Sequence, residues 1–203
     1  MNVRALLLLA LAWAFVAEAA AGEAFSFARL TAATTSIPTV RVTFTQEKHL
    51  AILDEPVVTK GLIEISRPLH AVRWEFTGKS VLVYKDGQLR RWGAEGKEES
   101  IGTKDQGVKS LAQQMEAMLD GKWDAMAEIF TVTLDPAGAP LIIFTPKTPD
   151  LARYLTRLEV RFRDDLTAPE RMLMITAGDD RTDYRYDPPQ LAVDLPVERF
   201  TKP

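Results

Sequence analysis

The sequence predicts a mainly β fold (α+β): one domain built on a barrel or a strongly curved antiparallel sheet, with a helical insert. Short runs with an apolar residue at every second position recur along the chain, separated by turn residues, a spacing typical of barrels and curved sheets. Residues 60–76 have the pattern of a hairpin with a bulky aromatic face. Between residues 108 and 130 the apolar period changes to that of a helix.

Residues 1–21 have the pattern of a secretory signal peptide. A positive start leads into an apolar stretch over residues 5–16, and small residues suited to cleavage after Ala19 or Ala21 follow. The apolar stretch is about 12 residues long, whereas a membrane-spanning helix needs roughly 20. We therefore expect export, cleavage, and a mature domain over residues 22–203. A buried N-terminal helix is the alternative.

Composition narrows the possible classes of protein. The chain has no cysteine and a net charge of −3, so a packed core must supply stability without disulfides. This charge gives no general attraction to nucleic acid or to anionic lipid surfaces. The basic clusters at Arg90-Arg91 and at residues 153–163 are interleaved with acidic or apolar residues. We interpret them as solvated strand faces and expect no nucleic-acid partner.

The mature chain begins with a predicted short helix from Phe25, which ends before Ile37-Pro38. An amphipathic strand follows, in which Val40, Val42 and Phe44 alternate with polar residues.

The hairpin at residues 60–76 comes next. Gly61 opens an apolar strand, and Arg67 with the proline after it forms the corner, because proline cannot donate to a strand ladder. After this corner, apolar residues alternate with Arg73 and Glu75, the period of a half-buried strand.

The later strands are predicted in the same way. An Asp-Gly pair between two apolar runs indicates a further hairpin. The predicted elements after residue 80 are this hairpin at 81–92, strands at 140–147, 155–162, 172–176 and 182–186, and an extended, edge-like tail at 188–196.

The helical insert begins near Val108 and reaches a stop at Gly121. Residues 123–130 are predicted to continue as a second short helix. Methionines on the apolar face can fill gaps in a core, or they can adapt to the varied shapes of a ligand. These helices could therefore form a cover whose apolar face contacts both the core and a ligand.

The sequence offers few catalytic groups. His49 and His70 are the only histidines, neither has the spacing of a metal site, and no phosphate-binding or nucleophile-elbow motif occurs. Paired aspartates at 164–165 and 179–180 lie in predicted turns, where aspartate is favoured for backbone reasons. We expect neither enzyme activity nor a metal or cofactor.

Several motifs resemble the periplasmic outer-membrane lipoprotein carrier family known as LolA, over essentially the whole mature region. The matching pieces are Phe44-Thr45-Gln46, Gly61 to Pro68 followed by Arg73-Trp74, Val83 to Gln88, and Phe144 to Lys147, with the strands from Leu158 to Tyr186 in the same order. The order glycine, Arg-Pro, Arg-Trp at this spacing is the most specific part.

This resemblance implies an incomplete antiparallel β-barrel with a helical lid over an apolar cavity. It implies a periplasmic, non-enzymatic carrier, expected to be a monomer. Such a carrier takes acylated lipoprotein or lipid cargo from an inner-membrane lipoprotein-releasing transporter and passes it to an outer-membrane receptor.

The resemblance also assigns roles to residues. Arg67 matches an arginine that holds the lid shut through hydrogen bonds to lid backbone carbonyls, a task suited to its planar five-donor group. The expected cavity wall consists of Phe44, Ile65, Trp74, Phe76, Leu82, Met115, Met118, Leu119 and Trp123; the strand face of Leu82 is not fixed by the pattern.

Other functions stay open at this stage. Where the family tends to have an aromatic pair after its Asp-Gly turn, this chain has Leu89 to Trp92, and its helical insert is long. A specialised paralogue could carry another lipid, such as a glycolipid or an acylated pigment intermediate. The same fold could also be a sensor of acylated ligands. A lipid hydrolase would need His49 or His70 as its base.

Overall fold

The computed structural model describes residues 24–101, 106–135, 137–176, 178 and 180–201. The predicted signal peptide lies outside these residues. The helices are α1 (Phe27–Thr35), α2 (Gln106–Asp120) and α3 (Pro149–Ala152), with 3-10 helices η1 (Trp123–Glu128) and η2 (Val197–Phe200). The strands are β1 (Thr39–His49), β2 (Val57–Ser66), β3 (Ala71–Phe76), β4 (Ser80–Lys85), β5 (Gln88–Gly93), β6 (Glu98–Glu99), β7 (Phe130–Leu134), β8 (Leu141–Pro146), β9 (Arg157–Phe162), β10 (Pro169–Ile175), β11 (Arg181–Tyr186) and β12 (Gln190–Leu191).

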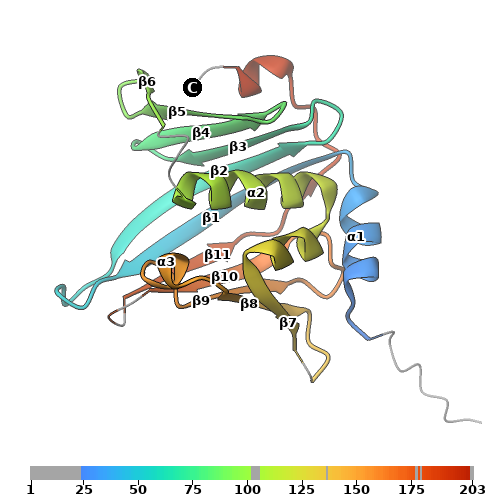
Figure 1. The fold of residues 1–203 in the computed structure, drawn as a ribbon. Coiled ribbons are helices and arrows are strands. Elements are labelled where there is room, and N and C mark those ends of the chain that lie inside the picture. The colour runs from blue at the N-terminus through green and yellow to red at the C-terminus, as the bar shows by residue number, and fades with distance from the viewer. Residues whose placement is uncertain (1–23, 102–105, 136, 177, 179, 202–203) are drawn as a thin grey trace, which may run out of the picture.

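All twelve strands form one antiparallel sheet in the order β6-β5-β4-β3-β2-β1-β11-β10-β9-β8-β7, with β12 paired to β1. The two ends, β6 and β7, are not paired with each other within the described residues, so the sheet stays open. β1 joins the two halves, because it pairs with β2 on one edge and with β11 on the other. The sheet curves around α2 and η1, which lie over one of its faces (Figure 1).

The predicted fold class, a single open, curved antiparallel sheet with few helices, is confirmed. The hairpin at 60–76 forms β2 and β3, and the Asp-Gly hairpin forms β4 and β5. Two local predictions need correction. The second short helix is a 3-10 helix that ends at Glu128, and Phe130 starts β7 instead of continuing that helix. The four-residue helix α3 was not predicted.

The sheet has a core on each of its faces. The larger core lies on the lid side, between the sheet and α1, α2 and η1. The smaller one lies on the opposite face, where Phe200 of η2 packs on a cluster that contains Ala71, Val83 and Trp92. The chain after β12 therefore crosses the back of β3 and β4 and covers it.

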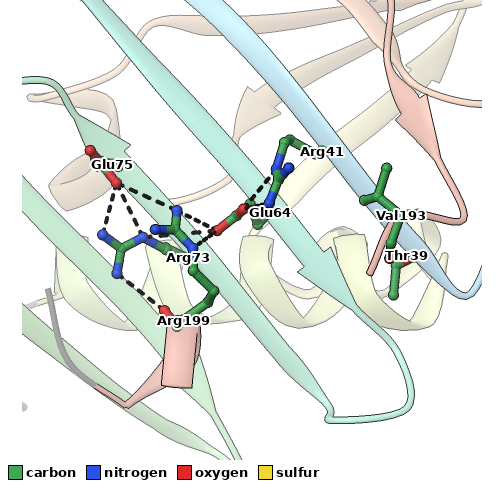
Figure 2. A network of polar contacts seen from close by, with 7 residues as sticks. All are labelled: Thr39, Arg41, Glu64, Arg73, Glu75, Val193 and Arg199. Carbon is green, nitrogen blue, oxygen red and sulfur yellow. Dashed lines mark hydrogen bonds and ion pairs between the residues drawn. The ribbon is translucent and has the colours of Figure 1, made fainter. Parts of the chain in front are cut away.

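This tail overturns the prediction that β3 is buried on one face only. Arg73 is 3% exposed and Glu64 of β2 is fully buried. Glu64 accepts hydrogen bonds from Arg41 (Nε to Oε1, 2.8 Å) and Arg199 (Nε to Oε2, 2.9 Å). Arg73 donates to Glu75 and to the carbonyl oxygen of Arg199. Figure 2 shows how this network ties η2 to β1, β2 and β3.

Among the described residues, no helix is long and apolar enough to cross a bilayer.

Candidate ligand cavity and its lid

Helix α2 covers the sheet face where the resemblance leads one to expect a lid, and it is called the lid below. It turns Met115 and Leu119, one helical turn apart, into the core, while Met118 is half-buried. The helix ends before Gly121, whose φ of +64° suits a glycine C-terminal cap. Thr31 of α1 donates its hydroxyl to the Gly121 carbonyl (2.6 Å). This end of the lid is therefore held against α1.

An aromatic cluster lies on the sheet face under the lid. The ring of Phe44 lies edge-on to Trp74 and Phe76, with centroids 6.2 and 5.6 Å away, and 5.6 Å from Tyr184. Gly61 makes this packing possible, since a Cβ there would lie 2.2 Å from Cζ of Phe44 and 2.3 Å from the carbonyl oxygen of Glu75. The cluster joins β1, β3 and β11 into one apolar floor.

A small apolar cavity of about 30 Å³ lies beside this floor, between the sheet, α2 and η1. Ile65 of β2 and Met118 of α2 line it, together with Trp123 of η1. Arg67 lies at its rim, and its wall also contains Val40, Val42, Ile63, Phe162 and Tyr186.

Of the predicted wall residues, Ile65, Met118 and Trp123 line the cavity as it stands. The other six belong to the packed core on the same face of the sheet: Phe44, Trp74, Phe76, Leu82, Met115 and Leu119. Leu82 thus faces the lid side, which the sequence left open. Lining residues missed by sequence reasoning include Val42 and Ile63, although each shares its strand face with a predicted residue, Phe44 and Ile65.

Arg67, just after β2, contacts both the α1–β1 linker and α2. Its Nη1 donates to the carbonyl oxygen of Ile37 (2.6 Å), and its Nη2 donates to the carbonyl oxygen of Met118 in α2 (3.2 Å). Burial lowers the pKa of Arg67, and the nearby Asp120 carboxylate opposes this shift. A charged donor thus contacts the lid backbone from the sheet.

Two more side chains near this corner contact the lid. Nε2 of His70 lies 3.6 Å from Oδ1 of Asp120, at the last residue of α2. Burial raises the pKa of Tyr84, with further contributions from the charge and hydrogen bond of Glu116. Polar contacts from the sheet therefore gather at the C-terminal half of α2.

The two histidines are far from forming a catalytic pair. His49 ends β1 and lies 3.7 Å from Glu47, whereas His70 lies in the β2–β3 turn at the opposite end of β2. Within the part of the chain that the structure describes, neither imidazole hydrogen-bonds a hydroxyl group. The same residues contain no group of three or more histidine, cysteine, aspartate or glutamate side chains placed to hold a metal ion.

Neither a family model nor a curated protein matches the chain. Solved structures do match. A LolA superfamily protein from Nitrosomonas europaea is 9% identical, with a TM-score of 0.49 over 87% of this chain and 96% of that one. An uncharacterised conserved protein from Thermus thermophilus is 8% identical, with a TM-score of 0.50 over 85% and 88%. MucB in its complex with MucA from Pseudomonas aeruginosa is 16% identical, with a TM-score of 0.41 over 86% and 58%.

At these identities the likeness concerns the fold alone.

Proposed function

We propose that this protein is a periplasmic carrier that covers the acyl chains of lipoproteins and shuttles them from the inner to the outer membrane. The observation that carries the proposal is the hydrogen bond from Arg67 to the Met118 carbonyl, which joins the end of β2 to α2 above an apolar floor. The donor would be a lipoprotein-releasing transporter of the inner membrane, and the acceptor a receptor of the outer membrane. Arg67 is the latch of the lid.

The size of the cavity supports a closed, empty state. Pockets for small molecules commonly measure about 300–1,000 Å³, whereas this cavity measures about 30 Å³. An acyl chain therefore enters only if α2 moves off the floor. That movement would expose the wall residues now packed in the core, among them Trp74, Met115 and Leu119, and the acyl chain would cover them in turn.

The free-energy balance suits a carrier that must also release its cargo. Burying each methylene group gains about 0.8 kcal/mol, so a long acyl chain could hold the lid open. Closing the lid restores its packing and the Arg67 bond to Met118. A ligand shifts such an equilibrium only by its differential affinity for the two states. A stable closed state therefore favours release.

Uptake of a fluorescent fatty acid by the purified protein, combined with native mass spectrometry of protein from a periplasmic extract, tests this proposal. We expect a bound species with the mass of an acylated lipoprotein or lipid. Met118→Gln, which puts an amide into the apolar wall, should weaken fatty-acid binding about tenfold. Tyr154→Gln, at a side chain 74% exposed, is the matched control and should bind as the parent does.

Protein that is empty after extraction and takes up no fatty acid would contradict a carrier. Lipid that binds but passes to no acceptor membrane would favour a sensor of acylated ligands. A non-lipoprotein lipid in the mass spectrum would identify a paralogue with another cargo.

A further inference from the structure

The turn between β1 and β2 carries a second feature, unrelated to the cavity. The hairpin tip, residues 50–58, exposes four large aliphatic side chains: Ile52 (88%), Val58 (53%), Leu53 (47%) and Val57 (40%). We propose that this hairpin tip inserts shallowly into a zwitterionic phospholipid surface that presents primary ammonium groups, such as one rich in phosphatidylethanolamine.

The hairpin tip is held in place by the fold. The β1–β2 ladder continues to the pair Lys48 and Val57, and the backbone N–H of Leu53 donates to the Leu50 carbonyl (2.9 Å). The N–H of Ala51 donates to Oδ1 of Asp180 (2.7 Å), in the turn before β11. The β1–β2 hairpin reaches out beyond its neighbours at one end of the sheet (Figure 1). A rigid protruding element presents these side chains without a cost of ordering on contact.

The residue types favour lipid over a protein as the occupant. Protein–protein interfaces depend on tryptophan, tyrosine and arginine anchors, while leucine and valine are under-represented among their most important residues. The hairpin tip has aliphatic side chains only at its exposed apolar positions. A convex aliphatic knob also needs no matching pocket when its partner is the fluid boundary between headgroups and acyl chains.

The charges select the kind of lipid. Asp54 and Glu55, directly after Leu53, are exposed and have neither an ion pair nor a hydrogen bond among the described residues. Their carboxylates complement the ammonium group of a zwitterionic aminophospholipid and repel an anionic surface. Lys48 and Lys60 are exposed on the strands behind the hairpin tip, farther from the lipid surface than the two carboxylates.

The hairpin tip is separate from the cavity. β2 has ten residues, with the tip at its start and Arg67 just after its end, and a strand of this length spans roughly 30 Å. Changes at the hairpin tip should therefore leave the lid and the aromatic floor intact. Membrane contact can then be tested on the empty protein, whatever the cavity carries.

The test is vesicle binding by the full mature chain. Because the chain has no cysteine, Ala51→Cys gives a single labelling site for an environment-sensitive fluorophore. We expect a blue shift with vesicles of phosphatidylethanolamine and phosphatidylcholine, a smaller one with phosphatidylcholine alone, and the smallest with added phosphatidylglycerol. The same label at Tyr154→Cys, 74% exposed, should report no transfer to an apolar environment.

Two pairs of variants separate the apolar and charged contributions. Ile52→Ser should weaken binding about tenfold, the loss expected for one large aliphatic side chain, whereas Val197→Ser, 40% exposed on η2, should not. Asp54→Lys with Glu55→Lys should reverse the preference towards phosphatidylglycerol, whereas Asp164→Lys, in the exposed β9–β10 turn, should not.

Absence of binding to any vesicle, unchanged binding by Ile52→Ser, or a parent preference for phosphatidylglycerol would overturn the proposal. Absence of binding would leave a protein as the occupant of the hairpin tip.

Discussion

Arg67 uses two separate nitrogens, one for the Met118 carbonyl of the lid and one for the Ile37 carbonyl before β1, so its geometry matters as much as its charge. Arg67→Leu removes the donors to Ile37 and Met118. We expect this variant to take up lipid and to release it at least tenfold more slowly, because the closed state loses its latch. Release is measured by stopped-flow transfer of a fluorescent fatty acid to acceptor vesicles.

Two further arginine variants serve as controls for the latch. Arg67→Lys should release slowly as well, since a single ammonium group cannot reproduce two donors in a plane. Arg153→Leu, at a side chain 75% exposed, should release as the parent does. Normal transfer by Arg67→Leu would rule out the latch.

The packing of the Phe44 ring requires a residue without a side chain at Gly61. In Gly61→Ala the new Cβ would overlap the Phe44 ring and the Glu75 carbonyl oxygen. We expect a loss of about 1–3 kcal/mol in the free energy of unfolding, typical of overpacking, measured by urea denaturation.

Gly78→Ala separates steric overlap from backbone strain. Gly78 has a φ of +70° and open space around its Cα, so alanine there should cost only the left-handed strain of about 1 kcal/mol. An equal effect at both positions would mean that Phe44 and β2 adjust freely to a larger residue.

Burial raises the pKa of Tyr184 to about 12, although its hydrogen bond from Gln46 opposes the shift, and burial raises the pKa of Tyr186 well above its usual value. The folded protein therefore keeps phenol protons that the unfolded chain loses above pH 10. The free energy of unfolding should therefore fall as the pH rises from 10 to about 12. The fall should reach up to about 1.4 kcal/mol per pH unit for each of the two tyrosines.

Urea denaturation across this pH range measures the effect of the tyrosines. Tyr184→Phe should flatten the pH dependence, whereas Tyr154→Phe, at an exposed side chain, should not. An unchanged slope in Tyr184→Phe would show that the phenol ionises equally in both states.

At the scale of elements, η2 is fixed to the sheet by charge as well as by Phe200. Glu64→Gln keeps the shape of the side chain but removes the negative charge shared by Arg41 and Arg199. Because Arg41 and Arg199 are each 35% exposed and stay partly solvated without the carboxylate, we expect a loss of about 1–3 kcal/mol and faster tryptic cleavage after Arg199.

The exposed pair of Glu98 with Arg90 provides the control for this network. Glu98→Gln should have no measurable effect on unfolding, because exposed ion pairs contribute little. A Glu64→Gln protein as stable as the parent would mean that the tail is held by its apolar contacts alone.

The same tail explains what the sequence could and could not predict about the elements. Alternation in β1 and the Asp-Gly turn between β4 and β5 are local signals, and the structure follows them. Glu64 and Arg73 alternate with apolar residues, as solvent-exposed strand residues do. They are nevertheless buried by η2, which lies more than a hundred residues later in the chain. Local periodicity cannot indicate such a distant cover.

The candidate site divides in a similar way. Ile65, Met118 and Trp123 could be placed at the cavity because strand parity and helix period assign them to apolar faces. How tightly the lid closes over Trp74 and Leu119 depends on packing between distant elements. The position of Phe162 and Tyr186 in the wall follows from sheet order, which no single strand pattern encodes.

At the scale of the whole molecule, the sheet has two halves, β2 to β6 and β7 to β11. Helix α2 lies between them in the sequence, and β1 lies between them in the sheet (Figure 1). The lid helix contacts β2, β3 and β4 on one side and η1, which precedes β7, on the other. Movement of α2 therefore affects both halves, while the sheet can keep its hydrogen bonds.

The pairing of β1 with β11 also has a consequence for biogenesis. Phe44 of β1 pairs with Tyr186 of β11. The ribosome synthesises β1 long before β11, so this pairing cannot form until β11 has been made. Pairings of such high contact order form slowly, and until then β1 presents an open, β-branched edge on which other chains can aggregate. The nascent chain should therefore depend on a holding chaperone until β11 has been synthesised.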